Sequence, residues 1–425
     1  MLQPALQVKK LFFIDETFEN KISYCLLAGF LIALPFEHFY SEILLTCFAI
    51  HTLIHLKKSR LIKLKNKTVW IISSIFFLSL FTIIYSNYIA EGFKDVGHQL
   101  GILLFPVCLS VTNIDLNKYK FSLLKIFATT CTVTVVYLYI HAFRVIHYFD
   151  FPLLTIFGKN FINQNFSAPI ELHSTYLSMY VALSISIFLF LFFKNPSLKN
   201  SQYIFYSAIL FAGLVQLSSR SVFVAMSLII IIAIPALLLH GKGRLHFSIV
   251  SLVIFLLVIS AITNIDSLRK RYVSDLEQDL SENAITPDLT ETRMKRWNLE
   301  LQLIKQSPLI GYGGGSEKDV LKEKYFEQKF YRSYLFQLNA HNQYFSFLIN
   351  SGIIGLFVYL YFLYFGFSGA IKKRDFLLLS FLILIAVVSV SENILDVNKG
   401  IFFYSFFSSL FLLNPDEKSH DAMST

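Results

Sequence analysis

The chain is organised around two stretches, ETRMKRWNLELQLIKQSPLIGYGGG at residues 291–315 and AHNQYFSFLINSGIIGL at residues 340–356. The first stretch combines a basic and aromatic segment with a glycine-rich turn. The second places a single histidine, His341, at the mouth of an apolar run. Chemically versatile side chains therefore gather here, in a chain that is otherwise mostly apolar, and this is where we expect the chemistry.

The composition excludes a water-soluble globular protein. Of the 425 residues, 55% are hydrophobic and only 15% are charged, and the mean hydropathy is +0.58. Apolar runs of membrane-spanning length recur along the chain, and about 20 such residues cross the hydrocarbon core as a helix. Because lipid offers no partner for backbone polar groups, each run should be helical. The sequence predicts an all-α polytopic membrane protein.

We expect about 12 transmembrane helices, near residues 22–37, 41–56, 69–88, 98–112, 121–143, 173–193, 203–217, 222–239, 246–264, 341–366, 375–390 and 401–413. The predicted organisation is nine helices in residues 1–265, a large helical loop at 266–340, and three helices with a cytoplasmic tail in 341–425.

The net charge of +9 is spread over short loops instead of one surface, so it describes topology and does not indicate nucleic-acid binding. With the N-terminus inside, the basic loops face the cytoplasm, namely Lys57–Lys67, Lys194–Lys199, Lys242–Arg244 and Lys372–Arg374. Two polar stretches then face outward, Arg144–Glu171 and Asp266–Ala340. The second also carries many cations, but long loops cross the membrane largely regardless of charge.

The long outer loop should be a helical cap over the membrane. A helix is predicted over Asp288–Gln306, with Asp288 and Glu291 in capping-box spacing. Pro308 ends it, a glycine turn follows, and a second helix runs from Ser316 to about Arg332.

Three residues are candidates for binding an anion. Arg293 and Trp297 share a helix face because they are four residues apart. An arginine forks two N–H groups onto a phosphate, whereas the alternative is a solvated helix with its tryptophan at headgroup level. Arg220 lies between two apolar runs, where an unpaired arginine costs about 3 kcal/mol or more. It is either functional or an interface residue whose charge reaches water.

Two histidines, an asparagine and a carboxylate complete the candidate site. The imidazole of His341, followed by Asn342 at the helix start, suits a base that deprotonates a hydroxyl. His173 has a similar position before another apolar run. Glu392, in an outer turn, can orient an arginine or bind sugar hydroxyls. The alternative for each is a residue of the membrane interface or a solvated turn.

No cofactor is expected. The four cysteines all lie in apolar runs, and no His, Cys or carboxylate cluster has metal-ligand spacing. The glycine turn lacks the lysine and hydroxyl residue of a P-loop and does not follow a strand. It is either a tight turn between helices or a cradle of N–H groups for an anion.

These features resemble the O-antigen ligase family, within the group that also holds O-antigen polymerases and O-linking oligosaccharyltransferases. The resemblance rests on RMKRW, SPLIGYGGG and HNQYFSFLINSGIIGL, on SSRS around Arg220, and on a large outer loop before the last three predicted helices. The elements HSTYLSMY and SENIL fit one branch of the family. Phe345 replaces the more usual leucine, and we expect little effect from an apolar exchange.

The resemblance implies a GT-C-like enzyme of the bacterial inner membrane with its active site facing the periplasm. Such enzymes transfer a glycan from a polyprenyl-diphosphate donor to an acceptor hydroxyl, such as that of lipid A-core, without metal or nucleotide sugar. It implies that His341 is the base, that Arg220 and Arg293 bind the diphosphate, and that Trp297, Asn342, His173 and Glu392 contact substrate. A polymerase with the same donor, or a lipid-glycan transporter, is the alternative; a transporter predicts charges near the midplane and internal symmetry.

Overall fold

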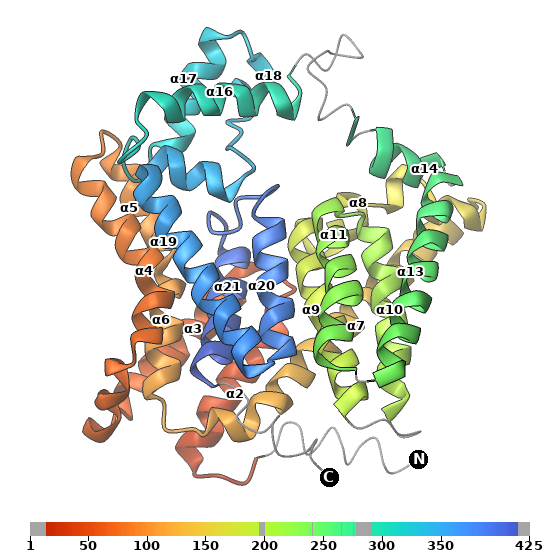
Figure 1. The fold of residues 1–425 in the computed structure, drawn as a ribbon, viewed down its shortest axis with the longest axis horizontal. Coiled ribbons are helices and arrows are strands. Elements are labelled where there is room, and N and C mark those ends of the chain that lie inside the picture. Colours follow the sequence, from red (N-terminus) through yellow and green to blue (C-terminus); the bar gives the residue numbers. More distant parts are fainter. Residues whose placement is uncertain are drawn as a thin grey trace.

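The structure, a computed structural model, describes residues 14–194, 200–239, 241–264, 266–274, 276–277 and 291–414. Every regular element in these ranges is a helix, so the predicted all-α fold is confirmed. Figure 1 shows a bundle of apolar helices with a group of shorter helices over one end.

Apolar runs of the sequence become the helices of the bundle, because a helix satisfies its backbone polar groups internally. The helices of the bundle are α2 (Phe18–Ala33), α3 (His38–Ile54), α4 (Lys67–Thr82), α6 (Leu100–Val111), α7 (Leu116–Tyr148), α9 (Ser174–Lys194), α10 (Gln202–Leu217), α11 (Arg220–Leu228), α13 (Gly241–Asn264), α19 (Gln343–Lys373), α20 (Phe376–Val388) and α21 (Asn398–Leu413). The other helices are α5 (Ile89–His98), α8 (Gln164–Ser167), α12 (Ile234–Leu237), α14 (Asp266–Arg269), α16 (Arg293–Gln306), α17 (Glu317–Glu327) and α18 (Tyr331–Leu335). The remaining turns are the 3₁₀ segments η1 (Lys58–Lys65), η2 (Ile83–Tyr85), η3 (Leu153–Phe157), η4 (Lys159–Phe161) and η5 (Ala168–Ile170) and the π segments η7 (Ile229–Ala233) and η8 (Lys270–Ser274).

Among the described residues, five helices are long and apolar enough to cross a membrane, or six if the pair α3 and η1, bent by 118°, is one span. The five are Lys67–Tyr85, Leu116–Tyr148, Ser174–Lys194, Arg220–Leu237 and Gln343–Lys373. A helix also lies in each of the other ranges predicted to span, but these are shorter or less apolar. The chain is a multi-pass membrane protein.

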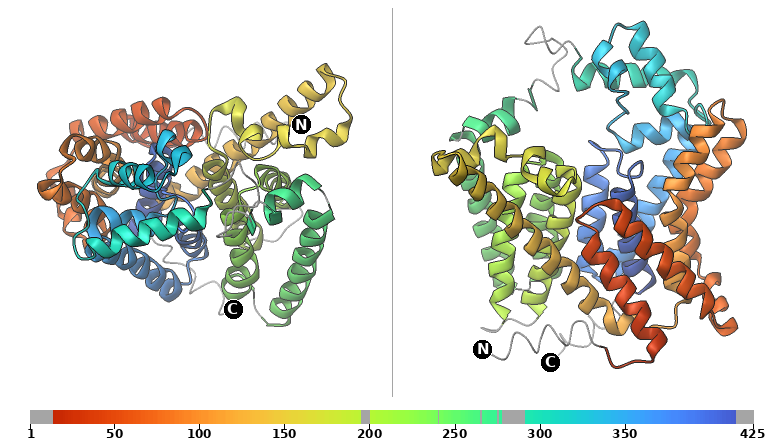
Figure 2. Two further views of the ribbon diagram at one scale, coloured as in Figure 1. Left: turned by 90° about the horizontal axis from the view of Figure 1, so that it is seen from above. Right: turned by 180° about the vertical axis from the view of Figure 1, so that it is seen from behind.

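Helix α21 forms the centre of the bundle. Its residues from Lys399 to Phe411 are all buried, because α21 packs against α4, α6, α9 and α20. Ring centroids lie 5.1 Å apart for Phe403 and Phe407, and 4.8 Å apart for Phe127 and Phe407. A helix that is apolar on every side is expected in such a position. Figures 1 and 2 show α21 enclosed by its neighbours.

The bundle has two chemically different ends. At one end, the cap of α16, α17 and α18 contacts the start of α19, where the Trp297 Nε1–H donates to the Ala340 carbonyl at 3.3 Å. At the other end, the Arg374 guanidinium donates to the Ala236 carbonyl at 3.2 Å. The basic segment η1 lies at this second end (Figure 1). Basic segments that the sequence assigned to one side of the membrane therefore share one end of the bundle.

The cap has an apolar core of its own. Leu299 and Leu303 of α16 pack against Val320, Leu321 and Tyr325 of α17. Part of α19 closes this core from below, since Ile349 belongs to the same cluster. The cap is therefore built on the N-terminal half of α19.

The first cap helix begins later than predicted. Helix α16 starts at Arg293, and the Thr292 hydroxyl caps it by accepting from the Lys295 N–H at 3.4 Å. Asp288 lies outside the described residues. Glu291 makes no capping box, because its buried carboxylate accepts from the Arg332 and Ser333 N–H groups at 2.9 and 2.7 Å. It therefore caps α18, where a carboxylate favours the positive end of the helix.

The second cap helix is shorter than predicted. Helix α17 ends at Glu327 instead of continuing to Arg332, and Lys329 has φ +61°. The Phe330 N–H donates to the Tyr325 carbonyl at 2.8 Å across this left-handed residue, which is how many helices end. A separate helix, α18, follows.

The glycine turn after α16 docks into a break in α19. Gly352 has φ +61° and ψ −156°, which interrupts the helix. The Tyr312 N–H donates to the Ile349 carbonyl at 2.8 Å, and the Ile353 N–H donates to the Pro308 carbonyl at 2.9 Å. The turn thus supplies partners for backbone groups that the break leaves unpaired.

Only glycine fits at this junction. A Cβ at Gly352 would lie 2.3 Å from the Leu309 carbonyl oxygen, and one at Gly311, where φ is +67°, would lie 2.4 Å from the Ile349 carbonyl oxygen. The turn's amides at Gly311, Tyr312, Gly313 and Gly314 all donate to carbonyls. This favours the tight-turn interpretation over the anion cradle.

Replacing Gly352 with alanine should destabilise the protein by about 1–3 kcal/mol, because a Cβ meets the Leu309 carbonyl and the dihedral angles are almost exclusive to glycine. Gly369→Ala, in the same helix with no atom within 4 Å of the added Cβ, is the matched control and should be neutral or slightly stabilising. Thermal unfolding in detergent measures both. Equal unfolding temperatures for the two variants would contradict this account of the junction.

Candidate active site

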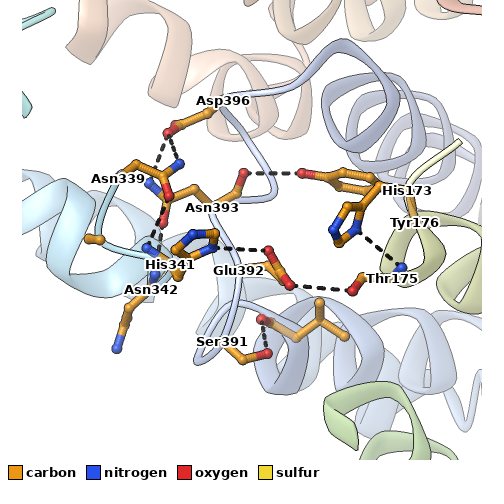
Figure 3. A network of polar contacts seen from close by, with 12 residues as sticks. His173, Thr175, Tyr176, Asn339, His341, Asn342, Ser391, Glu392, Asn393 and Asp396 are labelled. Atoms are coloured by element: carbon orange, nitrogen blue, oxygen red, sulfur yellow. Dashed lines mark hydrogen bonds and ion pairs between the residues drawn. The ribbon is translucent and has the colours of Figure 1, made fainter. Parts of the chain in front are cut away.

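A histidine and a carboxylate from distant parts of the sequence meet at the cap end of the bundle. His341 precedes α19, and Glu392 lies in the 389–397 loop between α20 and α21. The His341 Nδ1 is 3.5 Å from Glu392 Oε2, and both side chains are only partly exposed (Figure 3). The carboxylate fixes the proton on Nδ1 and leaves the Nε2 lone pair to accept another, which is the tautomer that a general base needs.

The Glu392 carboxylate is held and kept ionised. Its other oxygen accepts a hydrogen bond from the Thr175 hydroxyl of α9 at 3.3 Å. Burial tends to raise the pKa of Glu392, but the hydrogen bond from His341 and the charges of His341, His173 and Arg293 outweigh it and lower the pKa. An ionised Glu392 can orient His341 and stabilise it once it has taken up a proton.

His341 occupies a strained backbone position. Its φ is +46°, in the left-handed region that costs a residue with a side chain about 1 kcal/mol or more. The Asn339 carboxamide oxygen accepts from the His341 N–H at 3.2 Å. Such a conformation persists only where neighbouring contacts enforce it.

Glu317, the first residue of α17, enforces that conformation. One oxygen of its buried carboxylate accepts from the Ala340 N–H and from the Asn393 carboxamide, both at 2.9 Å. The other oxygen accepts from the Ser346 hydroxyl and from the Asn350 carboxamide, the latter at 3.3 Å. A single side chain of the cap therefore holds the residue before His341, the first turns of α19 and the loop that carries Glu392.

Asn393 extends this network. Its carboxamide oxygen accepts from the Asn342 N–H at 2.8 Å, and its NH₂ group also donates to Asp396 at 2.8 Å. The Asn342 side chain caps α19 by accepting from the Tyr344 and Phe345 N–H groups at 3.0 and 3.3 Å. Asn342, predicted from the sequence as a substrate contact, thus has its carboxamide oxygen engaged at the helix start.

The cap brings Arg293 toward the pair. Arg293 is the first residue of α16, and its charge is one of those that lower the pKa of Glu392. Trp297, one turn later, contacts Ala340 through its indole N–H and meets the Phe345 ring edge-on at 5.8 Å. Trp297 therefore fastens α16 over the residue that precedes His341.

Arg220 and His173 lie at the same end of the bundle. Arg220 begins α11, a helix that packs against α20, which leads into the Glu392 loop. His173 precedes α9 and accepts from the Thr175 N–H at 3.4 Å. Figure 3 shows His173 and His341 on opposite sides of Glu392.

Three residues of the site escape sequence reasoning, namely Glu317, Asn393 and Thr175. Glu317 reads as an ordinary acidic residue in the first turn of a helix, where acidic residues are common. Asn393 lies next to the predicted candidate Glu392 in SENIL, and Thr175 lies close to His173 in HSTYL. This closeness in sequence is the signal that could have indicated their part in the site. Among the described residues, no group of three or more His, Cys, Asp or Glu could hold a metal ion.

Part of the chain matches a known protein family. The family model described as "Wzy_C: O-Antigen ligase" matches residues 205–360. Over these residues the chain is similar to the O-antigen ligase family. This is a family of glycosyltransferase-type enzymes of lipopolysaccharide and polysaccharide biosynthesis, and the resemblance inferred from the sequence is confirmed. A comparison with curated proteins gives no match.

The segment that matches the family model contains some of the candidate residues and excludes others. Arg220, Arg293, Trp297, His341 and Asn342 lie within it. His173 and Glu392 lie outside its limits, and Glu392 meets His341 only in the folded chain.

Glu317→Gln should lower both stability and glycan transfer, because the amide NH₂ group would face hydrogen-bond donors and leave at least two of the four contacts unmade. Each buried group left unsatisfied costs about 1–3 kcal/mol. Glu323→Gln, on the exposed face of the same helix, is the control and should behave as wild type. Unfolding temperature and transfer rate are the measurements. A wild-type unfolding temperature and transfer rate for Glu317→Gln would show that the site does not depend on this carboxylate.

Asp396 should make stability depend on pH. Burial, and next the charge of Glu317, raise its pKa to about 8, from an ordinary value of about 3.9. Between about pH 4 and pH 8 the unfolded chain has lost a proton that the folded protein retains, so the free energy of unfolding falls as pH rises. Asp396→Asn cannot ionise, so its advantage in unfolding temperature over wild type should grow from pH 5 to pH 8. Parallel curves for the two proteins would show that Asp396 ionises normally.

Proposed function

We propose that the protein transfers a glycan from a polyprenyl-diphosphate donor to an acceptor hydroxyl at the outer face of the bacterial inner membrane. The observation that carries this proposal is the His341–Glu392 pair at 3.5 Å, beneath a cap that begins with Arg293. The O-antigen ligase match over the same segment supports it.

The chemistry requires one base. His341 Nε2 takes the proton of the acceptor hydroxyl as its oxygen attacks the anomeric carbon. The bond from that carbon to the diphosphate oxygen breaks, and the diphosphate leaves with the bonding electrons. A single in-line displacement inverts the anomeric carbon. His341 then releases its proton to water, and Glu392 has stabilised the imidazolium in the meantime.

The departing diphosphate requires positive charge. Arg220 and Arg293 can each fork two N–H groups onto phosphate oxygens and remain charged at every working pH. Fixed cations of this kind stabilise the developing charge without a divalent metal. In this proposal Trp297, Asn342 and His173 line the substrate path close to His341.

An apolar cavity supports a lipid-linked donor. It has a volume of about 260 Å³ and lies between α11, η7 and α13, with α9 and α10 at its edge. Its lining includes Phe211, Phe223, Met226, Ile230, Phe247 and Phe255. Phe223 is three residues after Arg220 on α11. A polyprenyl chain in this cavity would leave its diphosphate near Arg220.

The proposed membrane placement follows the charges. About twelve helices would cross the bilayer, with the N-terminus and basic loops cytoplasmic and residues 266–340 periplasmic, so that the large loop separates nine helices from the last three. The apolar helices found in each predicted range support this arrangement. Lipid A-core and a second lipid-linked glycan are the two acceptor classes, corresponding to a ligase and a polymerase.

His341→Ala should slow transfer by about a hundred- to ten-thousand-fold with donor binding nearly unchanged, because a general base acts on the rate and not on ground-state affinity. Single-turnover transfer and donor affinity in detergent measure the two effects. His147→Ala, an exposed histidine at the end of α7, is the control and should keep the wild-type rate. Transfer at the wild-type rate by His341→Ala would place the base elsewhere.

Arg220→Lys and Arg293→Lys should weaken donor binding and slow transfer together, because lysine keeps the charge and loses the two-pronged hydrogen bond. Arg332→Lys, an exposed arginine of the cap, is the matched control. The same assays apply. Normal binding and transfer by both variants would contradict the assignment of these arginines to the diphosphate.

The acceptor that the wild-type protein uses distinguishes a ligase from a polymerase. A ligase transfers the glycan to lipid A-core, and a polymerase transfers it to a second lipid-linked glycan.

A further inference from the structure

A second, polar cavity lies beside the catalytic pair. Its volume is about 490 Å³, and it is formed by the turn between α2 and α3, the end of α5, the residues before α9 and the start of α21. Side chains that line it include Phe36, Glu37, His98, Glu171, Tyr176 and Lys399. The mechanism described above uses none of these six residues.

The lining suits a sugar. Carboxylates such as Glu37 and Glu171 accept hydrogen bonds, and the imidazoles of the lining, such as that of His98, can donate them. The lining therefore offers both acceptors and donors, which matches sugar hydroxyls because a hydroxyl both accepts and donates. Phe36 and Tyr176 add apolar surface for the C–H faces of a ring.

The cavity adjoins the catalytic network. His173 and Asp396 line it, and His173 contributes to the ionisation of Glu392. The Tyr176 hydroxyl donates to the Asn393 carbonyl at 3.5 Å, next to Glu392 in sequence. Figure 3 shows Glu392 between His341 and His173, so the wall of the cavity that His173 forms lies next to the catalytic pair.

The cavity lies on the opposite side of the bundle from the apolar cavity. Helices α2, α3 and α5 border the polar cavity, and α11 and α13 border the apolar one, with α20 and α21 between them (Figures 1 and 2). An in-line displacement needs its nucleophile and leaving group on opposite sides of the anomeric carbon. If the diphosphate leaves toward Arg220, the hydroxyl must come from the α2–α3 side.

We propose that this polar cavity binds the sugar residues of the acceptor and directs its hydroxyl toward His341. The inference rests on the proposed function and adds the location and chemistry of the acceptor site. It assigns to Glu37, Glu171 and their neighbours a role in acceptor specificity, separate from donor binding.

Two kinds of variant test the assignment. The double variant Glu37→Gln, Glu171→Gln alters two exposed hydrogen-bonding groups, and Val397→Trp fills the cavity from an exposed position on its wall. Their controls are Glu323→Gln with Glu327→Gln, two exposed carboxylates of the cap, and Val390→Trp, an exposed valine of the same loop that does not line the cavity. Transfer is measured in detergent with a polyprenyl-diphosphate oligosaccharide as donor and, separately, lipid A-core and a second polyprenyl-diphosphate oligosaccharide as acceptor.

The cavity variants should raise the acceptor KM about tenfold or more, with the donor KM unchanged, because each altered hydrogen bond contributes only to acceptor binding. The control variants should match wild type. An unchanged acceptor KM in the carboxylate variant, or an equal rise in donor KM, overturns the inference while the proposed function stands. Absence of transfer by wild type to both acceptors overturns the proposed function itself, and the inference with it.

Discussion

The buried carboxylate of Glu317 is the contact on which the rest of the site depends. It comes from the cap, yet its four hydrogen-bond donors belong to the segment before His341, to α19 and to the 389–397 loop. Burying a carboxylate is costly unless hydrogen bonds replace its water. Four donors do so here. Through them, Glu317 also links the segment before His341, α19 and the 389–397 loop, which are far apart in the sequence. The left-handed backbone at His341 persists because its neighbour Ala340 is held in this way.

A second junction supports the first. The glycine turn after α16 inserts into the break of α19 at Gly352, and the backbone hydrogen bonds between the two close the break. Glu317 follows this turn directly, so its position is set by the same junction. The Asn350 carboxamide links them, because its oxygen accepts from the Ser316 hydroxyl and the Glu317 N–H, both at 3.2 Å. The cap is therefore attached to the bundle next to the segment that holds His341 in its left-handed conformation.

In the proposed mechanism, different parts of the fold bind the lipid of the donor, its diphosphate and the acceptor. Helices α11 and α13 border an apolar cavity, the cap supplies Arg293, and the opposite side of the bundle offers a polar cavity. The His341–Glu392 pair lies at the cap end of the bundle. A lipid-linked donor and a glycan acceptor can then approach from different sides without competing for the same surface.

The sequence by itself determined the all-α fold, the apolar helices and the helical cap. The length of an apolar run and the residues that begin or end a helix exert their effect within a short stretch of chain. It also determined which residue types could serve as base and cation, since His341 and Arg293 are chemically distinctive wherever they lie. Tertiary structure decided the partners: Glu291 caps α18 instead of α16, and Asn342 caps α19 while Glu317 reaches Asn393. Hydrogen bonds between residues far apart in the chain leave no periodic pattern in the sequence. They form only once the helices have packed and water has been removed from the donors and acceptors.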